Sequence, residues 1–363
     1  MTIYAVRGVF LPDESERTAW IVEGRLTFTR PGTCEVETVV DGGWILPGFV
    51  DAHCHIGYSP DGFLPEPAAM AAQALADRDA GTLLIRDAGS PVDNSSVQAR
   101  EDLPRLVRAG RHIARPKRYI RYLGVEVEPD QLVAEVERQA ARSDGWVKLA
   151  ADWIDRSKGP ASDLEPVWPD DALAAAISRA HELGARVAAH VFGEDAIAPL
   201  LAAGLDSLEH GTGLTDDTIA QAAAAGTALV PTLVNIDTFP QIAQAADGKY
   251  DLYAAHMRSL HATSRARIRA AWEAGVPLYT GTDAGGTLPH GLIPQEVRAL
   301  VAAGIPQADV IAQATWKARQ WLGFDSLVES GPADLVAYDA DPRTALDIID
   351  TPSRIVLRGR IVS

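Results

Sequence analysis

The feature that most constrains the fold is a recurring joint, in which a helical segment ends at a glycine and an apolar strand follows. Such glycines stand at positions 81, 184, 204, 226 and 275. A glycine just beyond a helix end adopts the left-handed conformation that turns the chain into the next element. Strands and helices that alternate in this way form a parallel sheet, so the sequence predicts an α/β protein.

Two α/β architectures fit this alternation. A (β/α)8 TIM barrel needs about 250 residues, and a chain of 363 residues leaves room for a small second unit. His190 and His210 lie twenty residues apart, which fits a single barrel repeat. An open doubly wound sheet is the alternative fold, but no glycine-rich phosphate loop supports it. We therefore expect a (β/α)8 barrel at residues 47–332.

The two ends of the chain differ from the middle. Residues 1–46 and 333–363 contain short alternating segments divided by glycine and proline, without a convincing helix. Such segments are typical of strands joined by turns. We expect the two ends to form together a small β-sandwich domain beside the barrel.

Two histidines lie two positions apart at the end of the apolar run that follows Pro47. Because alternate residues of a strand share a face, His53 and His55 point the same way and Cys54 points the other way. Two neutral imidazoles on one face can chelate one metal ion. By itself the pair is weak evidence, since a chain with 9 histidines can contain His-x-His by chance.

Further candidate ligands stand at the ends of later apolar stretches, namely Lys148, His190, His210 and Asp283. In a (β/α)8 barrel the carboxyl ends of the strands meet at one face, where active sites are found. Imidazole and carboxylate groups are ligands of zinc, and a catalytic zinc site keeps one position open. The sequence therefore predicts a metal site built from residues that lie far apart in the chain.

Lys148 does not fit such a site as an ammonium, because a cation repels the metal. Burial between Val147 and Leu149 can lower its pKa, and a neutral amine can react with carbon dioxide. The product, N6-carboxylysine, carries two oxygens that can bridge two ions. The alternative is an ordinary buried lysine paired with Asp152 or another acid.

The whole chain resembles the amidohydrolase superfamily, in particular its imidazolonepropionase-like and prolidase-like (Xaa-Pro dipeptidase-like) members. The resemblance is carried by residues 43–55 (GWILPGFVDAHCH), 208–211 (LEHG), 281–285 (GTDAG) and 333–336 (ADLV). It implies a (β/α)8 barrel, a β-sandwich formed by the two ends, and a binuclear metal centre with zinc as the expected metal.

The resemblance also implies roles for the ligands. His53 and His55 would bind the first ion with Asp283, His190 and His210 would bind the second, and carboxylated Lys148 would bind both. A hydroxide that bridges the two ions would attack a carbonyl carbon, and Asp283 would pass its proton to the departing nitrogen.

The expected reaction is hydrolysis of an amide-type C–N bond in a small polar molecule, such as an N-acyl amino acid, a dipeptide or a cyclic amide. Deamination of a heterocycle and lactone hydrolysis are alternative reactions of the same site. A catalytically inactive barrel that serves as a binding module is the alternative of another class. The chain departs from the prolidase-like pattern at Val191-Phe192-Gly193 and lacks a Gly-Gly-His loop, which puts an Xaa-Pro dipeptide substrate in doubt.

Substrate contacts are expected from three segments at the barrel face. Residues 151–169 form either a lid that carries Trp153 or a plain surface connection. His290, in the glycine-rich loop after Asp283, contacts substrate or supports the fold. The third segment is a basic run that either captures a substrate carboxylate or forms a solvated face. Its candidate residues are Arg115, Arg118, Tyr119, Arg121 and Tyr122.

Other polar residues near the motifs are assigned supporting roles. Glu209 and Asp51 flank candidate ligands, and both are expected to act on the ligands from behind or to support the fold; Glu209, next to His210, points to the other face of its strand. The remaining histidines are expected to be surface or packing residues, namely His112, His181, His256 and His261.

Charge and cysteine content limit the partners and the compartment. A formal net charge of −16 disfavours nucleic acid and anionic membranes. Only Cys34 and Cys54 occur, and we expect no disulfide between them, as in a reducing cytoplasm. The sequence shows no signal-peptide pattern and no apolar run of about 18 residues. The expected partner is a small-molecule substrate, and a homo-oligomer is left open.

Overall fold

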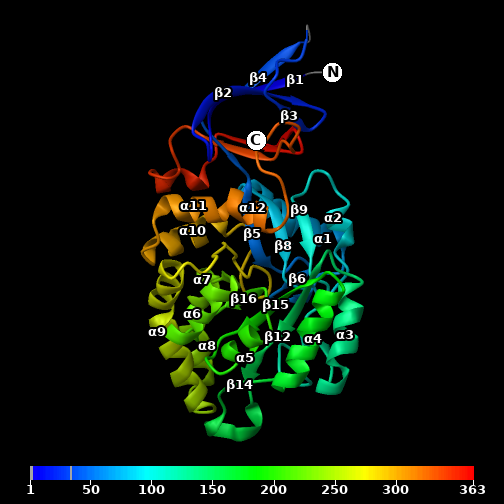
Figure 1. Ribbon diagram of the computed structural model, residues 1–363, viewed down its shortest axis with the longest axis vertical. Helices are drawn as coiled ribbons and strands as arrows, with labels where there is room; N and C mark the ends of the chain where they lie inside the picture. The colour runs from blue at the N-terminus through cyan, green and yellow to red at the C-terminus, as the bar shows by residue number, and fades with distance from the viewer. Residues whose placement is uncertain (1–2, 33–34) are drawn as a thin grey trace.

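The computed structural model describes residues 3–32 and 35–363 and shows a strand-rich end above a (β/α)8 barrel (Figure 1). Strand β1 and the C-terminus both lie in the strand-rich end, at the top of the view. The predicted fold class is confirmed. The prediction for the two cysteines is not tested, because Cys34 lies outside the described residues, whereas Cys54 is buried in the barrel wall.

Parallel strands form the barrel wall. Hydrogen-bonded neighbours follow the order β5-β8-β9 in one sheet and β11-β10-β12-β15-β16-β17 in another. Their bounds are Phe49–Cys54 (β5), Thr82–Asp87 (β8), Arg105–Arg108 (β9), Ile113–Ala114 (β10), Val125–Glu126 (β11), Trp146–Ala150 (β12), Arg186–Val191 (β15), Ser207–His210 (β16) and Ala228–Val230 (β17).

Residues 278–284 take the last place in the ring and close it. Leu278 pairs with Leu229 of β17, and Ala284 pairs with Cys54 of β5, both in parallel orientation. On the other side, the chain continues from β9 into β10, where Ile113 pairs with Leu149 of β12. The carboxyl ends of all these strands therefore meet at one rim.

Helices follow the strands and cover the outside of the barrel (Figure 1). They span Pro67–Asp79 (α1), Ser95–Gln98 (α2), Leu132–Ala140 (α3), Asp170–Glu182 (α4), Ile197–Ala202 (α5), Asp216–Ala225 (α6), Leu233–Ile236 (α7), Phe239–Ala246 (α8), Asp251–Glu273 (α9), Ile293–Ala302 (α10), Gln307–Ala314 (α11) and Trp316–Trp321 (α12). Within residues 3–32 and 35–363, none of them combines the length and the apolar character needed to cross a membrane.

The glycine joints behave as predicted. Gly226 ends α6 in the left-handed conformation, with φ 70° and ψ 21°. The other joint glycines, at positions 81, 184, 204 and 275, also have positive φ. At its other end α6 begins with a capping box, in which the Thr215 side chain accepts from the Thr218 backbone N–H. Local sequence signals therefore set the ends of the barrel helices.

One seven-stranded sheet combines the two ends of the chain, in the order β20-β19-β18-β4-β1-β2-β3. Its central strand β4 pairs in parallel with β1 and antiparallel with β18. The division of the chain at residues 46 and 333 stays a prediction, and β4 itself runs to Pro47. The strands span Ile3–Phe10 (β1), Ser15–Val22 (β2), Arg25–Thr27 (β3), Val36–Pro47 (β4), Leu335–Tyr338 (β18), Arg354–Leu357 (β19) and Arg360–Ile361 (β20).

A buried cation lies inside the barrel. Arg86 is 1% exposed, and its guanidinium carbon lies 4.5 Å from the Trp146 ring centroid and 4.9 Å from that of Trp321. It donates to the Ala52 carbonyl at 2.6 Å and to Glu209 Oε1 at 2.7 Å. Burial opposes the charge of Glu209, but Arg86 holds the pKa of that carboxyl well below its usual value. The ion pair ties β8 to β16 across the barrel.

We expect Arg86→Met to lower the free energy of unfolding by about 3–5 kcal/mol, because it leaves the Glu209 carboxylate buried without its cation. Urea unfolding, at equal metal content, measures the change. Arg86→Met/Glu209→Gln should recover most of the loss, because it removes both charges. Arg100→Met, which removes an exposed pair with Asp102, should change stability by less than about 1 kcal/mol. A double variant no more stable than Arg86→Met would contradict the account.

Candidate metal centre

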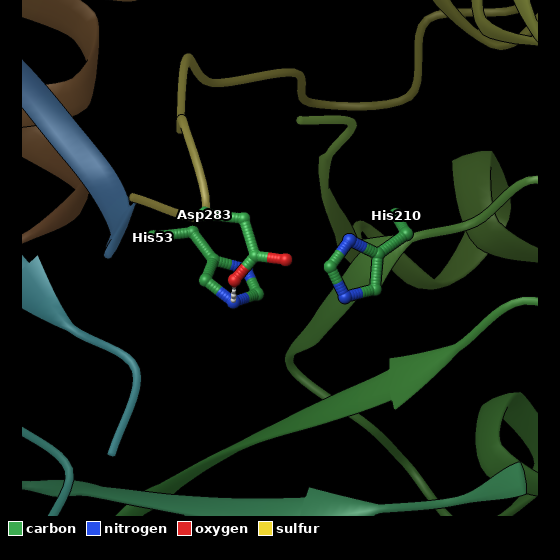
Figure 2. A group of neighbouring side chains, drawn as sticks. All are labelled: His53, His210 and Asp283. Atoms are coloured by element: carbon green, nitrogen blue, oxygen red, sulfur yellow. Dashed lines mark ion pairs between the residues drawn. The ribbon is translucent and has the colours of Figure 1, made fainter. Parts of the chain in front are cut away.

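The barrel rim brings the predicted ligands together. The ring centroids of His53 and His55 lie 5.2 Å apart, those of His53 and His210 lie 5.0 Å apart, and those of His190 and His210 lie 4.8 Å apart. Asp283 Oδ1 lies 2.9 Å from His55 Nε2 and 3.2 Å from His53 Nε2. Figure 2 shows Asp283 between the rings of His53 and His210. One ligand atom from each of these three residues falls within 4.8 Å of the others.

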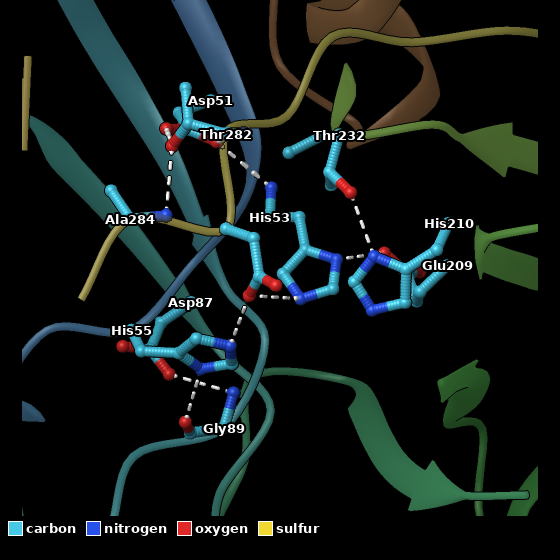
Figure 3. Close-up of polar contacts among 12 residues, drawn as sticks. Asp51, His53, His55, Asp87, Gly89, Glu209, His210, Thr232, Thr282 and Ala284 are labelled. Carbon is cyan, nitrogen blue, oxygen red and sulfur yellow. Dashed lines mark hydrogen bonds and ion pairs between the residues drawn. The ribbon is translucent and has the colours of Figure 1, made fainter. Parts of the chain in front are cut away.

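Polar partners behind three of the rings fix their orientation (Figure 3). His53 Nδ1 lies 2.7 Å from Glu209 Oε2, His55 Nδ1 lies 2.8 Å from the Gly89 carbonyl, and His210 Nδ1 lies 2.7 Å from Thr232 Oγ1. When Nδ1 donates to such a partner, Nε2 is left with a free lone pair for a metal. The arrangement therefore favours the tautomer in which Nε2 can bind a metal.

The two acidic residues next to ligands do support the site from behind. Glu209 contacts His53 as well as Arg86. Asp51 accepts from the backbone N–H of His53 at 3.0 Å and from Thr282 Oγ1 at 2.5 Å. Since Thr282 precedes Asp283, Asp51 holds the first and last strands of the ring in register.

Left-handed backbone recurs where the strands end. The φ angles are 69° at His210, 50° at Thr232 and 56° at Asp283, values that non-glycine residues seldom adopt. Such conformations cost about 1–3 kcal/mol each and persist at sites that the surrounding structure holds in place. The turn redirects each of these side chains at the rim.

Burial keeps part of the site uncharged. It lowers the pKa of both His190 and His210 well below the usual value, so these rings are neutral at pH 7. Burial would raise the pKa of Asp283, but His53 and its hydrogen bond hold that pKa well below its usual value. The site therefore presents neutral nitrogen donors next to a carboxylate.

Lys148 is completely buried, and burial lowers its pKa to about 8. Within the described residues, its Nζ has no hydrogen-bond partner. The alternative, a pair with Asp152, is not what the structure shows, because Asp152 Oδ2 instead accepts from the backbone N–H groups of Phe192 and Gly193, at 3.0 and 2.6 Å. A buried amine without a partner is costly and fits a lysine that acquires another group.

A cavity of about 450 Å³ opens onto part of the candidate metal site. His55, His190 and Asp283 lie in its wall, and so do Trp153 and Tyr119, two of the predicted substrate contacts. The side chain of Asp283 is 18% exposed and can therefore reach a molecule in the cavity.

Residues 151–169 form a hairpin at the cavity. Strands β13 (Asp152–Ile154) and β14 (Leu164–Pro166) pair across the 3-10 turn η2 (Arg156–Ala161). Trp153 lines the cavity, whereas Trp168 packs on the barrel and donates from Nε1 to the Ala150 carbonyl at 2.7 Å. One part of the segment thus lines the cavity, and another part packs against the barrel as a connection.

The other predicted substrate contacts lie outside the cavity wall. In the basic run, Arg115 lies 3.5 Å from Glu128, Arg118 lies 3.4 Å from Asp155, and the Arg121 guanidinium lies 5.8 Å from the Tyr122 ring centroid. Tyr122 is 68% exposed. The run fits the alternative of a solvated face, because its charges are paired with acids or turned to water.

His290 also lies away from the cavity wall. Its Nδ1 lies 2.8 Å from Asp77 Oδ2, and its side chain is only 3% exposed. Asp77 belongs to α1, and it also accepts from the backbone N–H of Gly291 at 2.7 Å. This pair, near Cys54 on the outer side of β5, fits the alternative of fold support: it fixes the loop after Asp283 to α1.

His112, which was expected to be a surface or packing residue, is buried beside the candidate metal ligands. Its ring is fully buried, 5.1 Å from the His55 ring centroid and 5.2 Å from that of Tyr119. Both of its ring nitrogens lack a hydrogen-bond partner within the described part of the chain. His112 lies between β9 and β10, directly before Ile113, and no motif in the sequence marks it.

Comparisons with known proteins agree with this architecture. A profile described as the amidohydrolase family matches residues 44–362. An uncharacterized protein of Mycobacterium tuberculosis is 54% identical over 356 residues, which cover 98% of this chain and 94% of the relative.

Solved structures share the fold at lower identity. A Xaa-Pro dipeptidase with bound methionine has a TM-score of 0.82 at 21% identity, covering 100% of this chain and 99% of that one. A putative prolidase from Bifidobacterium longum has a TM-score of 0.82 at 23% identity, covering 99% and 94% of the two chains. The predicted resemblance is confirmed, and this chain belongs to the amidohydrolase family.

Proposed function

We propose that this protein is a metal-dependent hydrolase that cleaves an amide-type C–N bond in a small molecule. The observation that carries the proposal is the convergence of oriented imidazoles on Asp283 at the floor of a cavity. The family name and the prolidase names of two structural relatives support amide-type chemistry. N-acyl amino acids, dipeptides and cyclic amides form the starting set of substrates.

The donor set fits divalent metal ions. Neutral imidazoles and a carboxylate are zinc ligands, and the partnerless Nζ of Lys148 fits a lysine converted to a carbamate. We propose that two ions, of which zinc is the expected metal, are held by His53, His55, His190, His210, Asp283 and carboxylated Lys148. When bound, such ions lower the pKa of water and polarise a carbonyl group.

The chain supplies the proton transfers through Asp283. Its low pKa keeps the carboxylate ionised at neutral pH, and Oδ1 lies within 3.2 Å of both His53 and His55. A carboxylate in this position can accept the proton of the attacking water and give it to the leaving nitrogen, which departs as an amine. The His53 and His55 rings contact Asp283, and a substrate held in the cavity would have its scissile bond beside this carboxylate.

We expect Asp283→Asn to reduce kcat by about 100-fold or more, because an amide cannot accept the proton. Metal analysis should show that much of the metal remains bound, since the four histidines and Lys148 are intact. Asp216→Asn, on the exposed first turn of α6, is the matched control and should leave kcat unchanged. Near-native turnover in Asp283→Asn would remove this residue from proton transfer.

Metal content distinguishes the proposed hydrolase from the alternatives. We expect about two zinc ions per chain; about one would favour a deaminase-like site, and none would favour a binding module. Lys148→Gln should lose at least one ion. In protein incubated with 13C-bicarbonate, a carbamate signal in the NMR spectrum should disappear in Lys148→Gln and remain in Lys158→Gln, whose side chain pairs with Glu165 at the surface. No carbamate signal in the wild type would contradict the role of Lys148.

A further inference from the structure

The cavity has an aromatic wall. The ring centroids of Tyr119 and Trp153 lie 4.8 Å apart, and the Tyr119 ring lies 5.2 Å from that of His190. Phe192, also in the wall, lies 4.3 Å from the same histidine ring. An aromatic ring in a ligand can pack on such a wall and bury its face and edge. The apolar surface therefore begins immediately beside the reacting centre.

The wall formed by α7 and α8 is polar but uncharged. Asn235, Thr238 and Gln241 follow one another at intervals of three residues, and all line the cavity. Asn235 lies near the base, since α7 starts just after Thr232, which contacts His210. The two carboxamides can donate and accept hydrogen bonds without carrying charge, and the Thr238 hydroxyl, which donates to the Asn235 carbonyl at 2.8 Å, can still accept. This wall suits amide, carbamate or alcohol groups.

Arg118, which precedes the cavity-lining Tyr119, is already paired with other groups. Arg118 lies behind Trp153, donates to the Trp153 carbonyl at 3.1 Å, and pairs with Asp155 at 3.4 Å. Among the cavity-lining residues that the structure describes, the acidic and basic side chains are His55, His190 and Asp283. All three belong to the proposed metal site. The rest of the described cavity wall therefore offers no charged side chain that could pair with a terminal carboxylate or ammonium of a substrate.

We propose that the substrate is an uncharged amide that carries an aromatic group, and not a dipeptide or N-acyl amino acid with a free carboxylate. This inference rests on the proposed function and narrows its substrate class. A carboxylate placed between these walls would lose its water without gaining a cation, whereas a neutral amide would keep its hydrogen bonds. The formal net charge of −16 adds a long-range preference against anions.

Matched pairs of compounds test the proposal on the zinc-loaded, full-length protein. Each pair differs only in a terminal carboxylate or carboxamide: 4-acetamidobenzoate and 4-acetamidobenzamide, hippurate and its amide, N-acetyl-Gly-Pro and its amide. Turnover and equilibrium binding by calorimetry are both measured. We expect the aromatic carboxamides to exceed their carboxylates by about tenfold or more in kcat/KM or in affinity, because only the carboxylate leaves an unpaired charge.

Variants at one wall position make the test specific. Gln241 is exposed at the cavity rim, so Gln241→Arg places a cation there without crowding the base. It should raise kcat/KM or affinity for the carboxylates by about tenfold, as expected when one charged partner is added. Gln241→Met, of similar size and without charge, controls for the loss of the Gln241 carboxamide and should not raise kcat/KM or affinity for the carboxylates.

The outcomes separate this inference from the proposed function. If the wild type binds or cleaves the carboxylates as well as the carboxamides, or binds no aromatic carboxamide, the uncharged substrate class is wrong. An unchanged preference in Gln241→Arg would also overturn it. Binding of carboxamides without cleavage of any amide supports the cavity assignment and contradicts only the proposed hydrolysis.

Discussion

The geometry of the candidate metal site depends on one buried chain of polar contacts, in which Glu209 contacts both Arg86 and His53. Glu209 uses one carboxylate oxygen for each partner, at 2.7 Å in both cases. Because the carboxylate is fully buried, its ionised state requires the guanidinium beneath it. The two-sided contact then fixes the His53 ring, and with it the position from which Asp283 is held. The same residues therefore stabilise the fold and fix the geometry of the site.

The rim converts regular strands into a site through local departures from strand geometry. His210 and Asp283 stand in left-handed conformations, as does Thr232, which orients His210. A regular strand would continue to alternate its side chains between the two faces. The turned backbone instead directs residues from neighbouring strands toward a common point. These left-handed conformations cost free energy, and the packing of the barrel wall, whose side chains are almost completely buried, stabilises them.

The sequence was informative wherever one local signal decided the outcome. The helix-ending glycines marked the joints, the two-residue period of β5 placed His53 and His55 on one face, and a strand-end position brought Asp283 to the rim. Lys148 lies in the middle of β12. The cavity wall was harder to predict, because it depends on how loops fold back over the rim. Arg118 looked like an anion-binding residue, but it pairs with Asp155, a partner that spacing could not reveal.

His112 and His290 also show that sequence position does not determine which residues lie near the site. His112 had no recognisable motif, yet the segment between β9 and β10 brings it next to the His55 ring. His290 followed a known motif closely, yet its contact is Asp77, which lies 213 positions earlier in the chain. Position relative to a strand end brought candidate ligands from distant parts of the chain to one rim, and their role as ligands stays a prediction. Proximity in sequence to those ligands did not predict contact with the cavity.

The shared terminal sheet has a consequence for the order in which the molecule is completed. Strand β4 lies between β1, made early on the ribosome, and β18, made only after the barrel region has been translated. The edge that pairs Trp44 with Tyr338 and Ile45 with Ala337 stays open until β18 has been made. An open strand edge invites pairing with other chains. Pairing with β18 covers this edge of β4 and removes that opportunity.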